Sequence, residues 1–141
     1  GSSKMSKSDP SDNSRINLTD NADVIAKKIK KAKTDREPIP GELAGLSKRP
    51  EATNLVGLYA ALADVSVDTV LQEFRGRGFD AFKPALTDLA VDKLSPLQGE
   101  MRRLLEDTTH IDTVLKRGAQ KANDLARPVI AEIHDLIGLL R

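Results

Sequence analysis

The apolar residues between positions 82 and 140 recur every three or four places, and this spacing limits the fold more than any other feature of the chain. Residues three and four apart lie on one face of an α-helix, so the pattern predicts two long helices, about 80–106 and 110–140. The connection between them is short, and short connections join antiparallel neighbours. We therefore expect a hairpin whose two apolar stripes form a core. The stripes are Phe82, Leu86, Leu89, Ala90, Leu94, Leu97, Met101 and Leu104 on the first helix, and Ile111, Leu115, Gly118, Ala122, Leu125, Val129, Ile133, Leu136 and Leu140 on the second.

Three shorter helices are predicted upstream, at about 21–33, 50–64 and 67–75. Side-chain oxygens suited to cap helix N-termini come from Thr19 or Asp20 for the first, from Ser66 for the third, and from Thr109 for the last long helix. The expected fold class is all-α: a helical bundle with a long antiparallel helix hairpin, preceded by a flexible loop and a basic helix. The lysines of the basic helix are expected on its outer surface, either as a solvated face or as phosphate contacts; they are Lys27, Lys28, Lys30, Lys31 and Lys33.

Residues 34–50 carry three prolines and two glycines, a composition typical of a hinge or an irregular connection. We place the main domain boundary there. The expected divisions are a loop and short extended segment at 1–18, a basic connecting helix at 19–34, the hinge at 35–49 and a helical domain at 50–141.

The composition narrows the function classes. The chain has 141 residues, a formal net charge of +1 and no cysteine, which excludes disulfides and thiolate metal sites. No apolar run approaches the length of a membrane span and no signal-type segment opens the chain, so we expect a cytoplasmic protein with no membrane partner. Only four aromatic residues occur, too few for an exposed base-stacking platform.

The first ten residues contain Lys4-Met5-Ser6-Lys7-Ser8, closed by Pro10. Small polar residues around two lysines favour a mobile loop over a helix or a core strand. Two ammonium groups with several hydroxyl and amide donors suit a polyphosphate, whose developing charge a moving loop can meet. On residue types alone the alternative is a solvated tail, with Gly1–Ser3 a vector scar.

A second candidate site lies at the end of the predicted hairpin. Arg102 and Arg103 precede the turn and Lys116 and Arg117 follow it, so an antiparallel hairpin would bring the two pairs to within about one helical turn, roughly 5 Å along the axis. The cluster is either a nucleic-acid contact or an ordinary charged surface. His110 and His134 have no partner at a metal-ligand spacing, and we expect no metal site.

Beyond these arguments, the chain resembles the bacterial tryptophanyl-tRNA synthetase family, which belongs to the class I aminoacyl-tRNA synthetases. Residues 4–8 read letter for letter as the KMSKS motif of that class. The likeness continues through Asp9-Pro10, Ile16-Asn-Leu18, the run Ile25–Asp35, Arg49-Pro-Glu-Ala-Thr-Asn-Leu55, Leu58-Tyr59, Phe82-Lys83, Leu86, Ser95-Pro-Leu-Gln98 and Arg102-Arg103. It covers nearly the whole chain, as the C-terminal portion of such an enzyme.

The resemblance implies an activity and roles for these residues. The family condenses tryptophan with ATP, which carries Mg²⁺, to give tryptophanyl-adenylate and pyrophosphate, and then transfers the aminoacyl group to a tryptophan-specific tRNA. By resemblance, Lys4, Met5, Ser6, Lys7 and Ser8 bind ATP, with Lys7 stabilising the pyrophosphate leaving group and Lys4 assisting. The helical domain corresponds to the module that docks the anticodon arm, with Arg102, Arg103, Lys116 and Arg117 as candidate contacts.

The resemblance also implies what these residues lack. The HIGH motif, the Rossmann-type sheet and the tryptophan pocket lie upstream in the family, and the intact enzyme is a homodimer. We therefore expect the 141 residues alone to be inactive. The alternatives are a stand-alone helical RNA-binding or interaction module that retains the motif, and a structural helix bundle with a basic tail.

Overall fold

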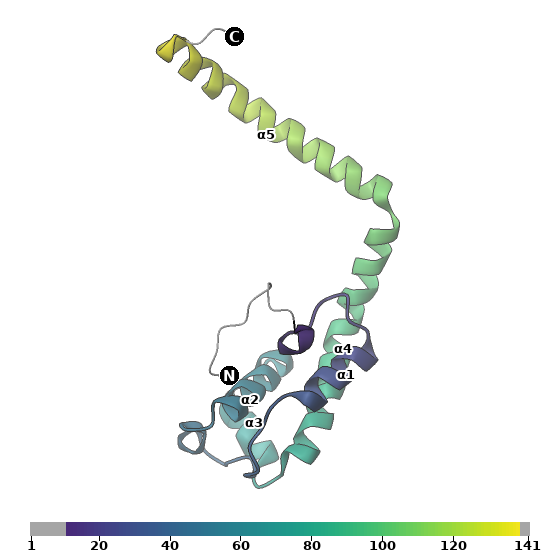
Figure 1. Ribbon diagram of the computed structural model, residues 1–141, viewed down its shortest axis with the longest axis vertical. Coiled ribbons are helices and arrows are strands. Elements are labelled where there is room, and N and C mark those ends of the chain that lie inside the picture. The colour runs from purple at the N-terminus through teal and green to yellow at the C-terminus, as the bar shows by residue number, and fades with distance from the viewer. Residues whose placement is uncertain (1–10, 139–141) are drawn as a thin grey trace. The chain divides into compact units, whose positions relative to one another are not determined.

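The computed structural model describes residues 11–138, and within that range every regular element is a helix (Figure 1). The expected all-α class is confirmed. The elements are η1 (Asp12–Ser14), α1 (Ala22–Lys31), η2 (Leu43–Leu46), α2 (Pro50–Ala63), α3 (Val67–Phe74), α4 (Phe79–Glu106) and α5 (Thr108–Ile137). The chain divides into two compact units, one up to Glu100 and one from Met101, so α4 contributes to both. Each unit is described by itself.

An aromatic cluster lies at the centre of the first unit. The ring of Phe74 meets those of Tyr59 and Phe82 edge-on, with centroid distances of 5.2 and 4.9 Å, and Phe79 lies 6.1 Å from Phe82. The chain's four aromatic residues are thus used in packing, and edge-on pairs add to the stabilisation that burial provides. Around them lie the buried residues Ile25, Ile29, Ile39, Leu46, Ala52, Leu55, Val56, Ala60, Val70, Leu71, Leu86 and Ala90.

Of the three predicted N-cap residues, one is confirmed and two are wrong. Ser66 caps α3 as expected, accepting a hydrogen bond from the backbone N–H of Thr69. Asn21, and not Thr19 or Asp20, caps α1, because the Asp20 carboxylate is engaged elsewhere. Asp107, and not Thr109, caps α5 by accepting from the N–H of His110 at 3.0 Å.

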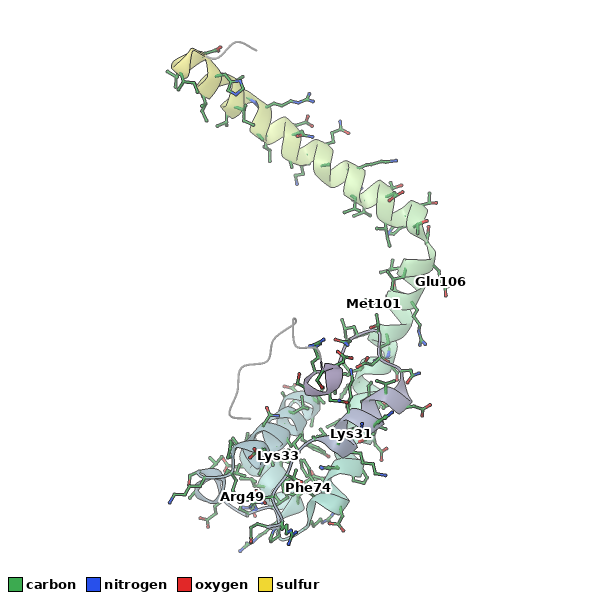
Figure 2. The ribbon with its side chains drawn as sticks, viewed as in Figure 1. Lys31, Lys33, Arg49, Phe74, Met101 and Glu106 are labelled. Atoms are coloured by element: carbon green, nitrogen blue, oxygen red, sulfur yellow. The ribbon has the colours of Figure 1, made fainter. Side chains whose placement is uncertain are left out.

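The irregular segment between α1 and α2 is part of the first unit and is held there by hydrogen bonds and by one buried side chain. Arg49 donates to both carboxylate oxygens of Asp35, at 2.8 and 2.6 Å, and to the carbonyls of Glu37 and Pro38 (Figure 2 labels Arg49). Ile39 is buried, and its backbone pairs with the turn after α3 through bonds of 2.8 and 2.9 Å. That a domain boundary falls in this segment stays a prediction.

The apolar stripe of α5, in the second unit, does not form a core. No residue of α5 is buried, and Leu115, Leu125 and Leu136 are 63%, 70% and 83% exposed, so the predicted core role of this stripe is wrong for the described chain. The second unit consists of one long helix and the last turns of another, which is too little chain to enclose a core. Leu97 of α4, which lies in the first unit and was also assigned to a core, is 58% exposed. The antiparallel hairpin stays a prediction.

Within residues 11–138, no single helix is long and apolar enough to cross a membrane. The pair α2 and α3 meets the length and composition test only across a bend of 108°. Their apolar residues Leu55, Val56, Val70 and Leu71 are buried in the core of the first unit.

Candidate functional site

The loop predicted to handle phosphate, Lys4–Ser8, lies outside the described residues. The structure describes the chain that follows it. Ser11 accepts a hydrogen bond from the N–H of Asn13 and so caps the short helix η1. Arg15 then takes an extended backbone, with φ −145° and ψ 154°, and leads the chain toward the start of α1.

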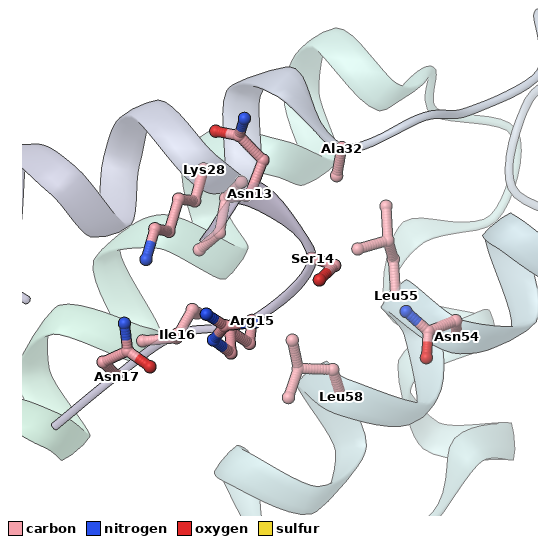
Figure 3. A pocket seen from close by; sticks show the side chains of 11 residues that line it. Asn13, Ser14, Arg15, Ile16, Asn17, Lys28, Ala32, Asn54, Leu55 and Leu58 are labelled. Atoms are coloured by element: carbon pink, nitrogen blue, oxygen red, sulfur yellow. The ribbon is translucent and has the colours of Figure 1, made fainter. Parts of the chain in front are cut away.

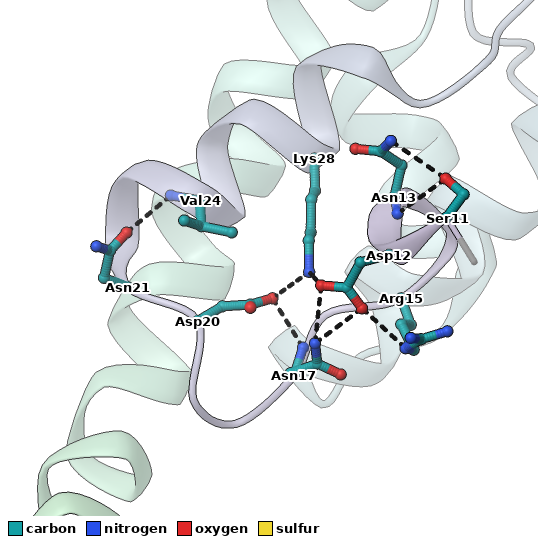
Figure 4. A network of polar contacts seen from close by, with 9 residues as sticks. All are labelled: Ser11, Asp12, Asn13, Arg15, Asn17, Asp20, Asn21, Val24 and Lys28. Carbon is teal, nitrogen blue, oxygen red and sulfur yellow. Dashed lines mark hydrogen bonds and ion pairs between the residues drawn. The ribbon is translucent and has the colours of Figure 1, made fainter. Parts of the chain in front are cut away.

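A polar network joins η1 to α1, with Lys28 at its centre (Figure 4). The Lys28 ammonium lies 2.7 Å from a carboxylate oxygen of Asp12 and 2.6 Å from one of Asp20. The side chains of Lys28 and Asp20 are only 8% and 9% exposed, whereas that of Asp12 is 47% exposed. Buried charges are tolerated when they are paired and hydrogen-bonded, which is the case here.

Asn17 and Arg15 complete the network. The Asn17 backbone N–H donates to Asp20 at 2.8 Å, and its side-chain amide donates to both oxygens of Asp12 at 3.0 Å. Arg15 pairs with Asp12 at 2.9 Å. One ammonium, one guanidinium and two carboxylates therefore balance in charge. The network ties three segments together: η1, the turn before α1 and the last turn of α1.

The network shifts the pKa values of its members. Hydrogen bonds from Lys28 and then from Asn17 hold the pKa of Asp12 below its ordinary value of 3.8. Burial lowers the pKa of Lys28, but the hydrogen bonds to Asp12 and Asp20 outweigh it, and the net shift is upward. Both groups are therefore ionised at neutral pH.

Sequence reasoning placed Lys28 on the outer surface of its helix, and that expectation is wrong. Lys28 follows Ile25 by three residues and precedes Ala32 by four, a spacing that puts it on the apolar face of α1. This spacing was the signal that could have found it. A lysine on the buried face of a helix is expected to form an ion pair with a carboxylate.

A cavity of about 740 Å³ lies beside the network, between the segment after η1 and helices α1 and α2 (Figure 3). Its apolar wall comes from Ile16, Ile29, Ala32, Leu55 and Leu58, and its polar edge from Asn13, Ser14, Arg15, Asn17, Lys28 and Asn54. An apolar floor with amide and cationic groups at its edge suits an apolar side chain that carries a polar end.

The second candidate site lies in the second unit. Arg102 and Arg103 occupy the last turns of α4, and Lys116 and Arg117 lie on α5; all four residues are exposed. The described residues contain no group of three His, Asp or Glu side chains that could hold a metal ion. A shared face for the four cations stays a prediction.

Comparisons with a family model and with curated proteins point to the same family. The sequence model for tRNA synthetases class I (W and Y) matches residues 1–94. The chain is 59% identical over all 141 residues to a tryptophan–tRNA ligase of Rhizobium meliloti (strain 1021), and covers 40% of that protein. It is 54% identical over 138 residues, 98% of the chain and 40% of the relative, to the ligase of Caulobacter vibrioides.

A more distant relative extends the same match. A tryptophan–tRNA ligase of Prochlorococcus marinus is 39% identical over 144 positions, which span 99% of the chain and 41% of the relative. The chain thus spans about 40% of the length of the curated relatives it matches. The family match covers more than half of the 141 residues, and the chain therefore belongs to the class I tRNA synthetases of the tryptophan and tyrosine type.

Proposed function

We propose that the chain is the C-terminal portion of a tryptophan–tRNA ligase and supplies its KMSKS loop and its helical tRNA-binding domain. The observation that carries this proposal is the 59% identity to such a ligase over all 141 residues. The family match over residues 1–94 joins the loop, helices α1 to α3 and the first half of α4 in one evolutionary unit. It disfavours a stand-alone RNA-binding module as the origin of the sequence.

In the proposed reaction, tryptophan attacks the α-phosphate of ATP, giving tryptophanyl-adenylate and pyrophosphate. The tRNA then takes the aminoacyl group and releases AMP. Lys7 stabilises the negative charge that grows on the pyrophosphate, and Lys4 assists it, while Met5, Ser6 and Ser8 complete the ATP-binding loop. Contacts made only as this charge develops raise the turnover rate and leave ground-state affinity unchanged. Mg²⁺ enters with ATP as part of the substrate.

The remaining partners follow from the same proposal. The helical part of the chain contacts the tRNA, with Arg102, Arg103, Lys116 and Arg117 as the candidate phosphate contacts. Tryptophan is bound by the part of the ligase that precedes these residues. The intact enzyme acts as a homodimer in the cytoplasm, and the 141 residues alone are inactive.

Tryptophan-dependent pyrophosphate exchange tests the proposal. The complete ligase that carries this chain should exchange pyrophosphate into ATP, and the 141-residue chain should not. In the complete ligase, Lys7→Ala should lower the exchange rate by about 100-fold or more, with little change in tryptophan affinity. Lys93→Ala, an exposed lysine on α4, is the control and should keep the normal rate. A normal rate for Lys7→Ala contradicts the role given to the loop.

A further inference from the structure

The Lys28 network lies close in sequence to the proposed ATP loop. Asp12 follows Ser8 by four residues. Four residues span at most about 14 Å when fully extended, so the position of Asp12 limits the space that Ser8 can reach. Any contact that fixes Asp12 therefore also restricts the loop.

Polar contacts hold the short helix η1 itself, while Ile16, two residues after it, packs against the core. None of its three residues is buried, so η1 itself adds no core residue that would hold it against α1. Asp12, by contrast, accepts from Lys28 at 2.7 Å and from Asn17 at 3.0 Å. Charge-assisted bonds of this length are strong and directional, and they fix a carboxylate to within narrow limits.

The Lys28 end of the network is buried. Lys28 emerges from the last turn of α1, next to the buried residues Ile25 and Ile29, and its side chain is only 8% exposed. Asp20, 9% exposed, binds the same ammonium at 2.6 Å. The buried Lys28 and Asp20 must stay paired, because separating them would leave a buried charge without a partner. The first unit therefore offers Asp12 one defined attachment point.

We propose that Lys28, together with Asp12 and Asp20, is a positioning set that fixes the point from which the ATP loop leaves the helical unit, and so sets the turnover of adenylate formation. The inference rests on the proposed function. These residues touch neither ATP nor tryptophan; they act through Lys4 and Lys7. Placement of catalytic groups is demanding, since a displacement of about 1 Å can cost about 100-fold in rate.

The test uses the complete ligase that carries this chain, with pyrophosphate exchange as the assay. Lys28→Met removes the charge and keeps most of the length of the side chain. Asp12→Asn removes only the exposed carboxylate and leaves Lys28 paired with Asp20, so the fold should persist. Both variants should lower kcat by about 10- to 100-fold. The KM for tryptophan should stay within about twofold, because that pocket is not disturbed.

The matched control is Asp35→Asn, which breaks another short ion pair of the same unit, between Asp35 and Arg49 at 2.6 Å. It should lower the unfolding temperature and leave kcat unchanged. Lys28→Arg, which keeps the charge, should recover part of the rate lost in Lys28→Met. A purely structural role would instead make kcat follow the unfolding temperature in all variants alike, which overturns the proposal.

Lys7→Ala, measured in the same assay, separates the role of the ATP loop from the role of the positioning set. A slow Lys7→Ala with normal rates for Lys28→Met and Asp12→Asn refutes the positioning set alone. A normal rate for Lys7→Ala refutes both the role of the loop and the positioning set. Should Lys28→Met fail to fold, Asp12→Asn decides the question.

Discussion

The ammonium group of Lys83 lies 2.7 Å from the carbonyl oxygen of Ala32, at the end of α1. It also donates to the carbonyl of Lys30 at 3.1 Å. The last carbonyls of a helix have no partner within the helix, and the negative end of the helix dipole lies there. A side chain from α4 thus completes the hydrogen bonding of α1 and joins two helices that are about 50 residues apart in sequence.

Lys83→Met should destabilise the first unit. The change keeps most of the apolar stem but leaves the carbonyls of Lys30 and Ala32 without this donor. The free energy of unfolding should fall by about 1.5–3 kcal/mol, the usual net worth of a hydrogen bond made by a charged group. Urea unfolding of the 141-residue chain, followed by circular dichroism, measures it. Lys93→Met, an exposed lysine on the same helix, is the control and should change the value by less than about 0.5 kcal/mol. Equal effects of the two changes contradict the capping role.

The ion pair between Asp35 and Arg49 should make stability depend on acid pH. The hydrogen bond from Arg49 holds the pKa of Asp35 below its ordinary value of 3.8. A carboxyl whose pKa is lower in the folded state stabilises the fold above its unfolded pKa, and this contribution disappears as the pH falls through the folded pKa. The difference in unfolding free energy between wild type and Asp35→Asn should therefore be constant near neutral pH and shrink below about pH 4. A difference independent of pH contradicts the pairing.

Two glycines should respond oppositely to alanine. Gly76 has φ +74°, a conformation that L side chains rarely adopt, although an added Cβ would meet no atom within 4 Å. Gly76→Ala should therefore cost about 1 kcal/mol through backbone strain alone. Gly57 lies within α2 with equally open space, so Gly57→Ala should add about 0.5–1 kcal/mol of stability. Urea unfolding of both variants provides the measurement, and each serves as the control for the other. A stabilising Gly76→Ala would rule out the strained turn.

The helical period predicted the type and place of the five α-helices within residues 11–138, because an amphipathic stripe is a local property of the sequence. Helix caps were less predictable. Asp20 is a good capping residue by type, but in the structure its carboxylate binds Lys28, and Asn21 caps the helix instead. A local preference was overridden by a tertiary ion pair.

The contacts of the candidate site were still harder to predict from local sequence patterns. The pairing of Lys28 with Asp12 spans 16 residues, and no local spacing rule indicates which carboxylate a buried lysine will meet. For the apolar stripe of α5, the local pattern was predicted correctly but its burial was not. The sequence shows that one face is apolar, but the period says nothing about what covers that face, and Leu125 is 70% exposed.

The basic residues of the second unit can be tested through the salt dependence of tRNA binding. If Lys116 contacts a phosphate, Lys116→Gln in the complete ligase should weaken binding and reduce the slope of log K against log salt by about 0.7–0.9. Filter binding between about 50 and 200 mM salt measures that slope. Lys121→Gln is the control, because Lys121 points about 140° away around the same helix and should leave the slope unchanged. Equal slopes for wild type and Lys116→Gln would remove Lys116 from the interface, since a lost phosphate contact must release fewer counterions.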